Sequence, residues 1–205
     1  MDYRIRPATE ADAAAICQIY NQGIEDRLAT LETELRTADE RRQWLAARSP
    51  RHPVIICELA MPASSSNRPP TPLPERAAPA TTSLATSSNR PPTFLPDHAA
   101  PATTIAGLGS LNVFNARDAY RFVADISVYV ERQWRGKGAG RILLTWLVEL
   151  GREHGYHKLV LSAFPFNTGG MALYDKLGFR TVGVYKEQGR LDGAWVDTII
   201  MERLL

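Results

Sequence analysis

Three glycines stand where a run of strand-forming residues gives way to an apolar helix pattern. The segment VYVERQWRGKGAGRILL spans residues 128–144, and its glycines are Gly136, Gly138 and Gly140. A glycine costs about 1 kcal/mol in a helix interior relative to alanine, so helix propensity does not explain them. A glycine-rich turn leaves backbone N–H groups pointing outward at the positive end of the helix dipole, where a phosphate can approach closely. The segment therefore predicts an anion site, with a glycine-softened turn that binds nothing as the alternative.

Two common nucleotide motifs do not fit this turn. The P-loop requires G-x-x-x-x-G-K-[ST], which the residues around Gly136 and Gly138 do not supply. The dinucleotide fingerprint G-x-G-x-x-G fails at its third glycine, where the chain has Arg141. The turn alone does not identify its phosphate ligand.

The cysteines and histidines do not form a recognisable metal or redox pattern. Cys17 lies in a helix pattern and Cys57 in a strand pattern, and neither belongs to a CxxC or zinc spacing, so both are expected in the core. His154 and His157 are three residues apart, but Gly155 between them is expected to end the helix. We therefore expect no metal site.

The elements that must position the glycine turn follow from the pattern of apolar residues. Strands are expected at residues 3–8, 53–60, 103–114, 120–130, 156–164, 179–188 and 194–203. Helices are expected to start at Thr9–Asp12 and Thr37–Glu40, to run from Ile142 to Leu150 with a stop at Gly155, and to span Met171–Leu177. The order β-α-α-β-β-β-α-β-α-β-β predicts an α/β (α+β) domain with a mixed sheet and helices on its faces.

A tandem repeat interrupts this pattern between two of the strands. SSNRPPTPLPERAAPATT (65–82) recurs as SSNRPPTFLPDHAAPATT (87–104), with fifteen of eighteen positions identical. Two copies rich in Pro, Ser, Thr and Ala cannot bury enough apolar surface to form a solenoid. We expect residues 1–205 to form one domain, interrupted at about 61–103 by a low-complexity insert; a peptide-binding role for the proline-rich pieces is the alternative.

The overall composition excludes several classes of function. The formal charge is +2 and no basic face or tail stands out, so nucleic acid is not an expected partner. The N-terminus lacks the apolar region of a secretory signal, and no apolar stretch is long enough to span a bilayer. A cytoplasmic protein without membrane contact is expected.

Two motifs together resemble the GCN5-related N-acetyltransferase (GNAT) superfamily. Arg135-x-x-Gly138-x-Gly140 is similar to its pyrophosphate loop for acyl-CoA, and the segment from Asn167 to Phe179 is similar to its N-x-x-S/A-x-x-L-Y-x-K-x-G-F pattern. The resemblance implies a mostly antiparallel sheet, splayed at the acetyl-CoA site, with helices on both faces. It narrows to the phosphinothricin/arsinothricin N-acetyltransferase group through residues 20–37, 119–130 and 183–204. That group implies a homodimer with the active site near the subunit interface.

The resemblance assigns expected roles to individual residues. It implies that Asp125 is the base, at a position where the group carries Glu, and that Tyr174 protonates the departing thiolate. A structural carboxylate and a packing tyrosine are the respective alternatives. Arg117 and Tyr120 are expected to bind an anionic acceptor. The alternative for Arg117 is an exposed loop arginine without a ligand. The residues expected to bind acetyl-CoA are Val128, Tyr129, Val130, Arg135, Gly136, Lys137, Gly138, Ala139, Gly140, Arg141 and Asn167.

The expected activity is transfer of acetyl from acetyl-CoA to the α-amino group of a glutamate-like amino acid. Phosphinothricin, arsinothricin and methionine sulfone or sulfoximine are the acceptor types that the resemblance implies, with a detoxification or resistance role. An acetyltransferase for another amine, such as a polyamine, would require an acidic pocket instead of Arg117. A non-catalytic acyl-CoA-binding module would bind CoA without turnover.

Overall fold

A seven-stranded sheet forms the centre of the molecule in the computed structural model, which describes residues 2–60 and 103–205. Its strands are β1 (Tyr3–Pro7), β2 (Val54–Ala60), β3 (Thr103–Val113), β4 (Val123–Val130), β5 (Lys158–Ala163), β6 (Arg180–Leu191) and β7 (Ala194–Leu204). They lie in the order β1-β2-β3-β4-β5-β7-β6, and only β4 and β5 run parallel to each other. The predicted element order and the mixed, mostly antiparallel sheet are confirmed.

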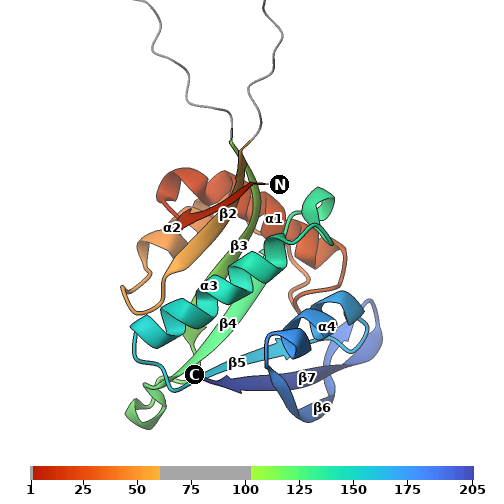
Figure 1. The fold of residues 1–205 in the computed structure, drawn as a ribbon. Helices are drawn as coiled ribbons and strands as arrows, with labels where there is room; N and C mark the ends of the chain where they lie inside the picture. The colour runs from red at the N-terminus through yellow and green to blue at the C-terminus, as the bar shows by residue number, and fades with distance from the viewer. Residues whose placement is uncertain (1, 61–102) are drawn as a thin grey trace, which may run out of the picture. The chain divides into compact units, whose positions relative to one another are not determined.

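Helices cover both faces of this sheet, as Figure 1 shows. On one face lies α3 (Ala139–Glu153), whose Leu143 and Leu147 are fully buried in one core cluster with Ile126 of β4. On the other face lie α1 (Ala13–Glu25) and α2 (Ala38–Ala46); Ile16 of α1 packs in a second cluster. The last helix, α4 (Thr168–Lys176), contributes apolar side chains to the first cluster. Each face of the sheet therefore has its own core.

Three elements start three residues away from their predicted positions. The helix expected from Ile142 begins at Ala139, because Gly138 adopts a left-handed conformation (φ 98°) and serves as its N-cap. The strand expected from residue 120 begins at Val123, since Asp118–Tyr120 form a 3-10 helix. The helix expected from Met171 starts three residues earlier, at Thr168, where the Asn167 side chain caps it.

The pairing of β4 with β5 is short, so the centre of the sheet is paired over only part of these strands. The parallel register joins Val123–Asp125 to Lys158–Val160 and ends there. Beyond Asp125, β5 continues to Ala163 against β7, whereas β4 continues to Val130 against β3. The two central strands therefore diverge over the second half of β4, and the predicted splay is confirmed.

The tandem repeat falls almost entirely on residues 61–102, which lie outside the described part of the chain. No helix in residues 2–60 or 103–205 is long and apolar enough to cross a membrane.

Candidate active site

The glycine turn lies between a short 3-10 helix, Arg132–Trp134, which follows β4, and the first turn of α3. Gly136 and Gly138 have φ values of 72° and 98°, in the left-handed region that favours glycine. A Cβ atom at Gly136 would meet nothing within 4 Å, and one at Gly138 would meet only the Tyr3 ring at 3.9 Å. The first N–H groups of a helix have no intrahelical partner, so the amides of the first turn of α3 are directed outward. The turn is thus an open backbone cradle at a helix N-terminus, as an anion requires.

The Arg135 side chain connects this turn to the end of β4 and to the end of α1. Its Nε donates to the carbonyl oxygen of Val130 at 3.1 Å, and its Nη1 lies 2.6 Å from Oδ2 of Asp26 at the end of α1. Arg132 also bonds to Asp26, and these two arginines lower the pKa of the Asp26 carboxyl. The guanidinium of Arg135 is therefore engaged in holding the turn to α1.

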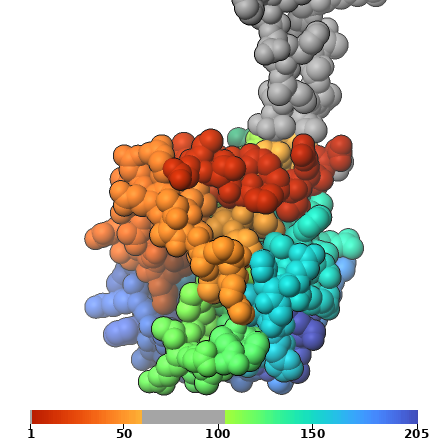
Figure 2. All heavy atoms as spheres, turned by 90° about the vertical axis from the view of Figure 1, so that its left-hand side faces the viewer, coloured from red at the N-terminus to blue at the C-terminus, as the bar shows by residue number. Residues whose placement is uncertain are grey.

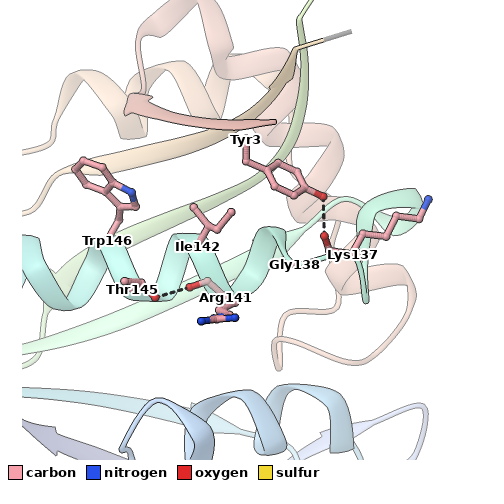
Figure 3. Close-up of a pocket in the computed structure, with 7 residues that line it drawn as sticks. All are labelled: Tyr3, Lys137, Gly138, Arg141, Ile142, Thr145 and Trp146. Carbon is pink, nitrogen blue, oxygen red and sulfur yellow. Dashed lines mark hydrogen bonds between the residues drawn. The ribbon is translucent and has the colours of Figure 1, made fainter. Parts of the chain in front are cut away.

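A groove runs beside the turn along α3, as Figure 3 shows. Its volume is about 660 Å³, and it is lined by Tyr3, Lys137, Gly138, Arg141, Ile142, Thr145 and Trp146. The Tyr3 hydroxyl donates to the carbonyl oxygen of Lys137 at 3.0 Å, which joins β1 to the turn. The groove therefore places two cations, Lys137 and Arg141, next to the cradle. Tyr3 and Trp146 were not predicted to line the site. Tyr3 lies far from the glycine motif along the chain, and Trp146 belongs to the helix that follows the motif.

A narrow cleft of about 50 Å³ occupies the space where β4 and β5 diverge. It is lined by Ala29, Ile126, Ser127, Val128, Tyr129, Leu161, Ser162, Ala163, Asn167 and Tyr174. Four of the predicted residues, Val128, Tyr129, Asn167 and Tyr174, thus come together from β4 and α4 although they are far apart in sequence. Val130, two residues further along β4 than Val128, does not line this cleft.

Two side chains from the region of α4 face the cleft with different surroundings. The Tyr174 ring packs edge-on against Phe179, with ring centroids 6.2 Å apart, and burial raises the pKa of its phenol above 10. Asn167 accepts a hydrogen bond from the Gly170 N–H at 3.0 Å and donates to the carbonyl oxygen of Leu28 at 3.3 Å. Tyr174 can therefore act as a proton donor at neutral pH, whereas Asn167 caps α4 and ties it to the loop after α1.

Asp125 is half-buried on β4, where the pairing with β5 ends. Burial raises the pKa of its carboxyl to about 6, and a hydrogen bond from the Asn112 side chain, with Nδ2 3.4 Å from Oδ2, opposes part of that rise. The carboxylate does not line the cleft, but Ser127, two residues further on the same side of the strand, does. Asn112 and Ser127 were missed from the sequence; the polar positions of the strand patterns 103–114 and 120–130 were the only signal.

Arg117 and Tyr120 lie in the loop that leads into β4. Both are exposed, and the Tyr120 ring packs against Phe114 with centroids 5.6 Å apart. Figure 1 shows this loop (green) at the end of β4 opposite to the start of α3. Neither Arg117 nor Tyr120 lines the cleft. The candidate residue that follows them most closely in the sequence is Asp125.

Within the described residues, no cluster of three or more His, Cys, Asp or Glu side chains could hold a metal ion. The groups that the site offers for chemistry are backbone amides, Asp125, Tyr174 and the cations near the turn.

Comparisons with known proteins agree with this geometry. The profile of the Acetyltransferase (GNAT) family matches residues 54–179. The chain is 25% identical over 204 residues to a phosphinothricin N-acetyltransferase of Streptomyces coelicolor, covering 100% of this chain and 97% of the relative. It is also 25% identical to an L-methionine sulfoximine/L-methionine sulfone acetyltransferase of Salmonella typhimurium, covering 97% and 92%. Among solved structures, the Salmonella typhimurium protein yncA, with its cofactor acetyl-CoA, superposes with a TM-score of 0.76 at 25% identity, covering 100% and 95% of the two chains.

Proposed function

Because this chain belongs to the acetyltransferase (GNAT) family, we propose that it acetylates the α-amino group of a small glutamate-like amino acid. It is an acetyl-CoA-dependent N-acetyltransferase. The single observation that supports the site best is the coincidence of the β4–β5 splay with the glycine cradle at one end of β4. The acceptor class is proposed from the relatives, which are named for phosphinothricin and for methionine sulfoximine and sulfone.

The cradle and the splay fit the two chemically different parts of acetyl-CoA. We assign its pyrophosphate to the backbone of Gly136–Arg141, with the side chains of Lys137 and Arg141 beside it. We assign its pantetheine arm to the edge of β4 from Val128 to Val130, where β5 no longer pairs with the strand. When bound, acetyl-CoA supplies the acetyl group as a thioester. The backbone amides of this unpaired strand edge are suited to stabilise charge that develops on a carbonyl oxygen.

Asp125 and Tyr174 supply the acid–base groups in this proposal. A carboxyl with a pKa of about 6 is mostly ionised at neutral pH and is still basic enough to accept a proton. Because Asp125 does not line the cleft, the proton of the acceptor ammonium reaches it through a water molecule rather than directly. The buried phenol of Tyr174 is protonated at neutral pH, so it can donate a proton to the departing thiolate.

Arg117 is our candidate for binding the acceptor's acidic group. None of the ion pairs among residues 2–60 and 103–205 includes Arg117, whereas the neighbouring Arg121 pairs with Asp118. A planar guanidinium suits a carboxylate or phosphinate oxygen pair. Tyr120, in the same loop, would line the acceptor's path to β4.

We also propose that the protein is a cytoplasmic homodimer. The loop with Arg117 exposes Val113 (58%), Phe114 (42%) and Phe122 (45%), and Figure 2 shows it on the surface in green. Such a group of exposed apolar side chains suits an interface with a second copy. The two free thiols, Cys17 and Cys57, are both buried and suit a reducing compartment. Light scattering on the purified protein tests the dimer, and a monomer at micromolar concentration would contradict it.

The activity is tested by following CoA thiol release from acetyl-CoA with a panel of acceptors. The panel contains phosphinothricin, arsinothricin, methionine sulfone, glutamate and the polyamine spermidine, each at the same concentration. We expect release with at least one of the glutamate-like amino acids and none with spermidine. Release with spermidine alone would overturn the acceptor class, and acetyl-CoA binding without release for every acceptor would indicate a binding module.

A further inference from the structure

Polar side chains of β3 and β4 form a small group on the sheet face opposite to α3. On β4, Ala124 and Ile126 belong to the core beneath α3, so Asp125 and Ser127 point to the other face. On β3, Asn112 is the register partner of Asp125. The three polar side chains therefore lie side by side across two hydrogen-bonded strands.

Asn112 bridges the other two members of this group. Its Nδ2 lies 3.1 Å from Oγ of Ser127 and 3.4 Å from Oδ2 of Asp125. The amide has two hydrogens, so it can donate to both oxygens at once. The reversed amide would direct its own oxygen toward the carboxylate, which is unfavourable, and this fixes the orientation of the side chain.

Ser127 and Asp125 differ in their access to the cleft. Ser127 lines the cleft between β4 and β5, whereas the shorter reach of an aspartate leaves Asp125 outside that lining. Because Asn112 donates to the Ser127 oxygen, the serine hydroxyl hydrogen is directed away from Asn112 and can be offered to another acceptor. Asn112 thus connects the buried carboxylate with the wall of the cleft.

We propose that Asn112 is a positioning residue for acetyl transfer, which holds the Asp125 carboxylate and the Ser127 hydroxyl in one hydrogen-bonded unit. This inference rests on the proposed role of Asp125 as the base. Two cations on neighbouring elements, Arg48 and Lys158, are engaged elsewhere. Arg48, which follows α2, donates to the carbonyls of His52 and Leu111, and Lys158 of β5 pairs with Glu202 of β7 at 3.0 Å. The amide of Asn112 is therefore the group through which the structure can adjust this carboxylate.

The test replaces Asn112 by leucine, which has a similar volume and no amide. The pKa of Asp125 is measured by carbon NMR titration of the labelled carboxyl groups, with Asp125→Asn used to assign its signal. We expect the pKa of Asp125 to be higher in Asn112→Leu than in the native protein, because a donor to the carboxylate has been removed. An unchanged pKa would overturn the proposal. This measurement needs no turnover, so a shifted pKa in a protein that acetylates no acceptor would contradict the proposed function and leave the Asn112–Asp125 link intact.

Kinetic measurements separate positioning from a loss of stability. In Asn112→Leu we expect kcat to fall by roughly tenfold to a hundredfold, with the acid limb of its pH profile moved to higher pH. Asn21→Leu is the matched control: Asn21 of α1 makes hydrogen bonds to the backbone of Arg36, far from Asp125 in the chain. Its acid limb should not move, even if the protein melts at a lower temperature.

A double-mutant cycle decides whether Asn112 acts through Asp125. If it does, Asn112→Leu causes little further loss of kcat in an Asp125→Asn background, because the group that it positions is already absent. Equal losses in both backgrounds would show that Asn112 contributes only to packing. Partial recovery of kcat in Asn112→Gln, which keeps the amide, would support the positioning role, and no recovery relative to Asn112→Leu would count against it.

Discussion

At the scale of single residues, the site depends on the Asp125 carboxylate, whose ionised form is disfavoured by burial. Asp125 is half-buried between two strands, and burial raises the pKa of its carboxyl from 3.8 to about 6. The same burial that disfavours the charge makes the group a better base near neutral pH. Asp125 therefore has two measurable consequences, one for the rate and one for stability.

The first consequence concerns the pH dependence of the reaction. A base must be ionised to accept a proton, so we expect kcat at saturating substrates to fall as the pH decreases through about 6. Steady-state rates between pH 5 and 8 measure this limb. A limb near pH 4 would mean that the titrating carboxyl is exposed and that Asp125 is not the base.

The second consequence concerns the free energy of unfolding. Because the folded-state pKa is raised, the buried charge destabilises the protein as the pH rises from 3.8 through about 6, at most by about 3 kcal/mol. Asp125→Asn should therefore unfold at a higher temperature than the native protein at pH 8, with the two temperatures converging near pH 4. Calorimetry at the two pH values makes the comparison. A lower melting temperature at pH 8 would show that the carboxylate forms a net stabilising contact.

At the scale of elements, the glycine turn lies between β4 and α3. Its Gly136 and Gly138 have positive φ values, which residues with a side chain adopt only with strain. Gly138→Ala should cost about 1 kcal/mol of stability, because its φ is 98°, and should raise KM for acetyl-CoA roughly tenfold by placing a Cβ in the cradle. Gly155→Ala is the matched control, with φ 71° and nothing within 4 Å of the added Cβ, at the other end of α3. It should lose similar stability with KM unchanged. An equal rise of KM in both variants would contradict the cradle.

The order of the elements could be predicted because each one has a local pattern. The capping residues Thr37 and Glu40 start α2, and the left-handed Gly155 follows the end of α3, as the sequence indicated. Residues within one element also set the glycine cradle, so its position could be predicted as well. Local patterns are sufficient for these features because the interactions that determine them span only a few residues.

The parts of the site that depend on distant residues could not be predicted in this way. That Arg135 binds acetyl-CoA stays a prediction, whereas the pairing of its guanidinium with Asp26, 109 residues away, had no signal in the sequence. The partner of Asp125 is Asn112, and this contact depends on the register between β3 and β4. Strand register follows from packing of the whole sheet, and no motif around Asp125 specifies it.

At the scale of the whole molecule, the described residues on both sides of the insert form one hairpin. Ala60 at the end of β2 is the register partner of Thr103 at the start of β3. The two strands can therefore be joined directly by a short turn, which has a low entropic cost of closure.

Replacing residues 61–102 by Asn-Gly should leave the domain and its activity intact. We expect kcat and both KM values within about twofold of the native protein, and an equal or higher melting temperature, because a two-residue turn then closes the paired ends of β2 and β3. Steady-state kinetics and thermal unfolding of the deletion variant provide the check. A large loss of kcat in a folded variant would show that the insert contributes to the site.

The central claim is that this fold transfers acetyl to the α-amino group of a glutamate-like amino acid with Asp125 as the base. The most direct test is mass spectrometry of the products formed from acetyl-CoA with phosphinothricin and with methionine sulfone, by the native protein and by Asp125→Asn. We predict an α-N-acetyl product with the native protein, and a rate at least roughly a hundredfold lower with Asp125→Asn at unchanged acetyl-CoA affinity. No N-acetyl product from either acceptor with the native protein, or equal rates in the two proteins, would contradict the account.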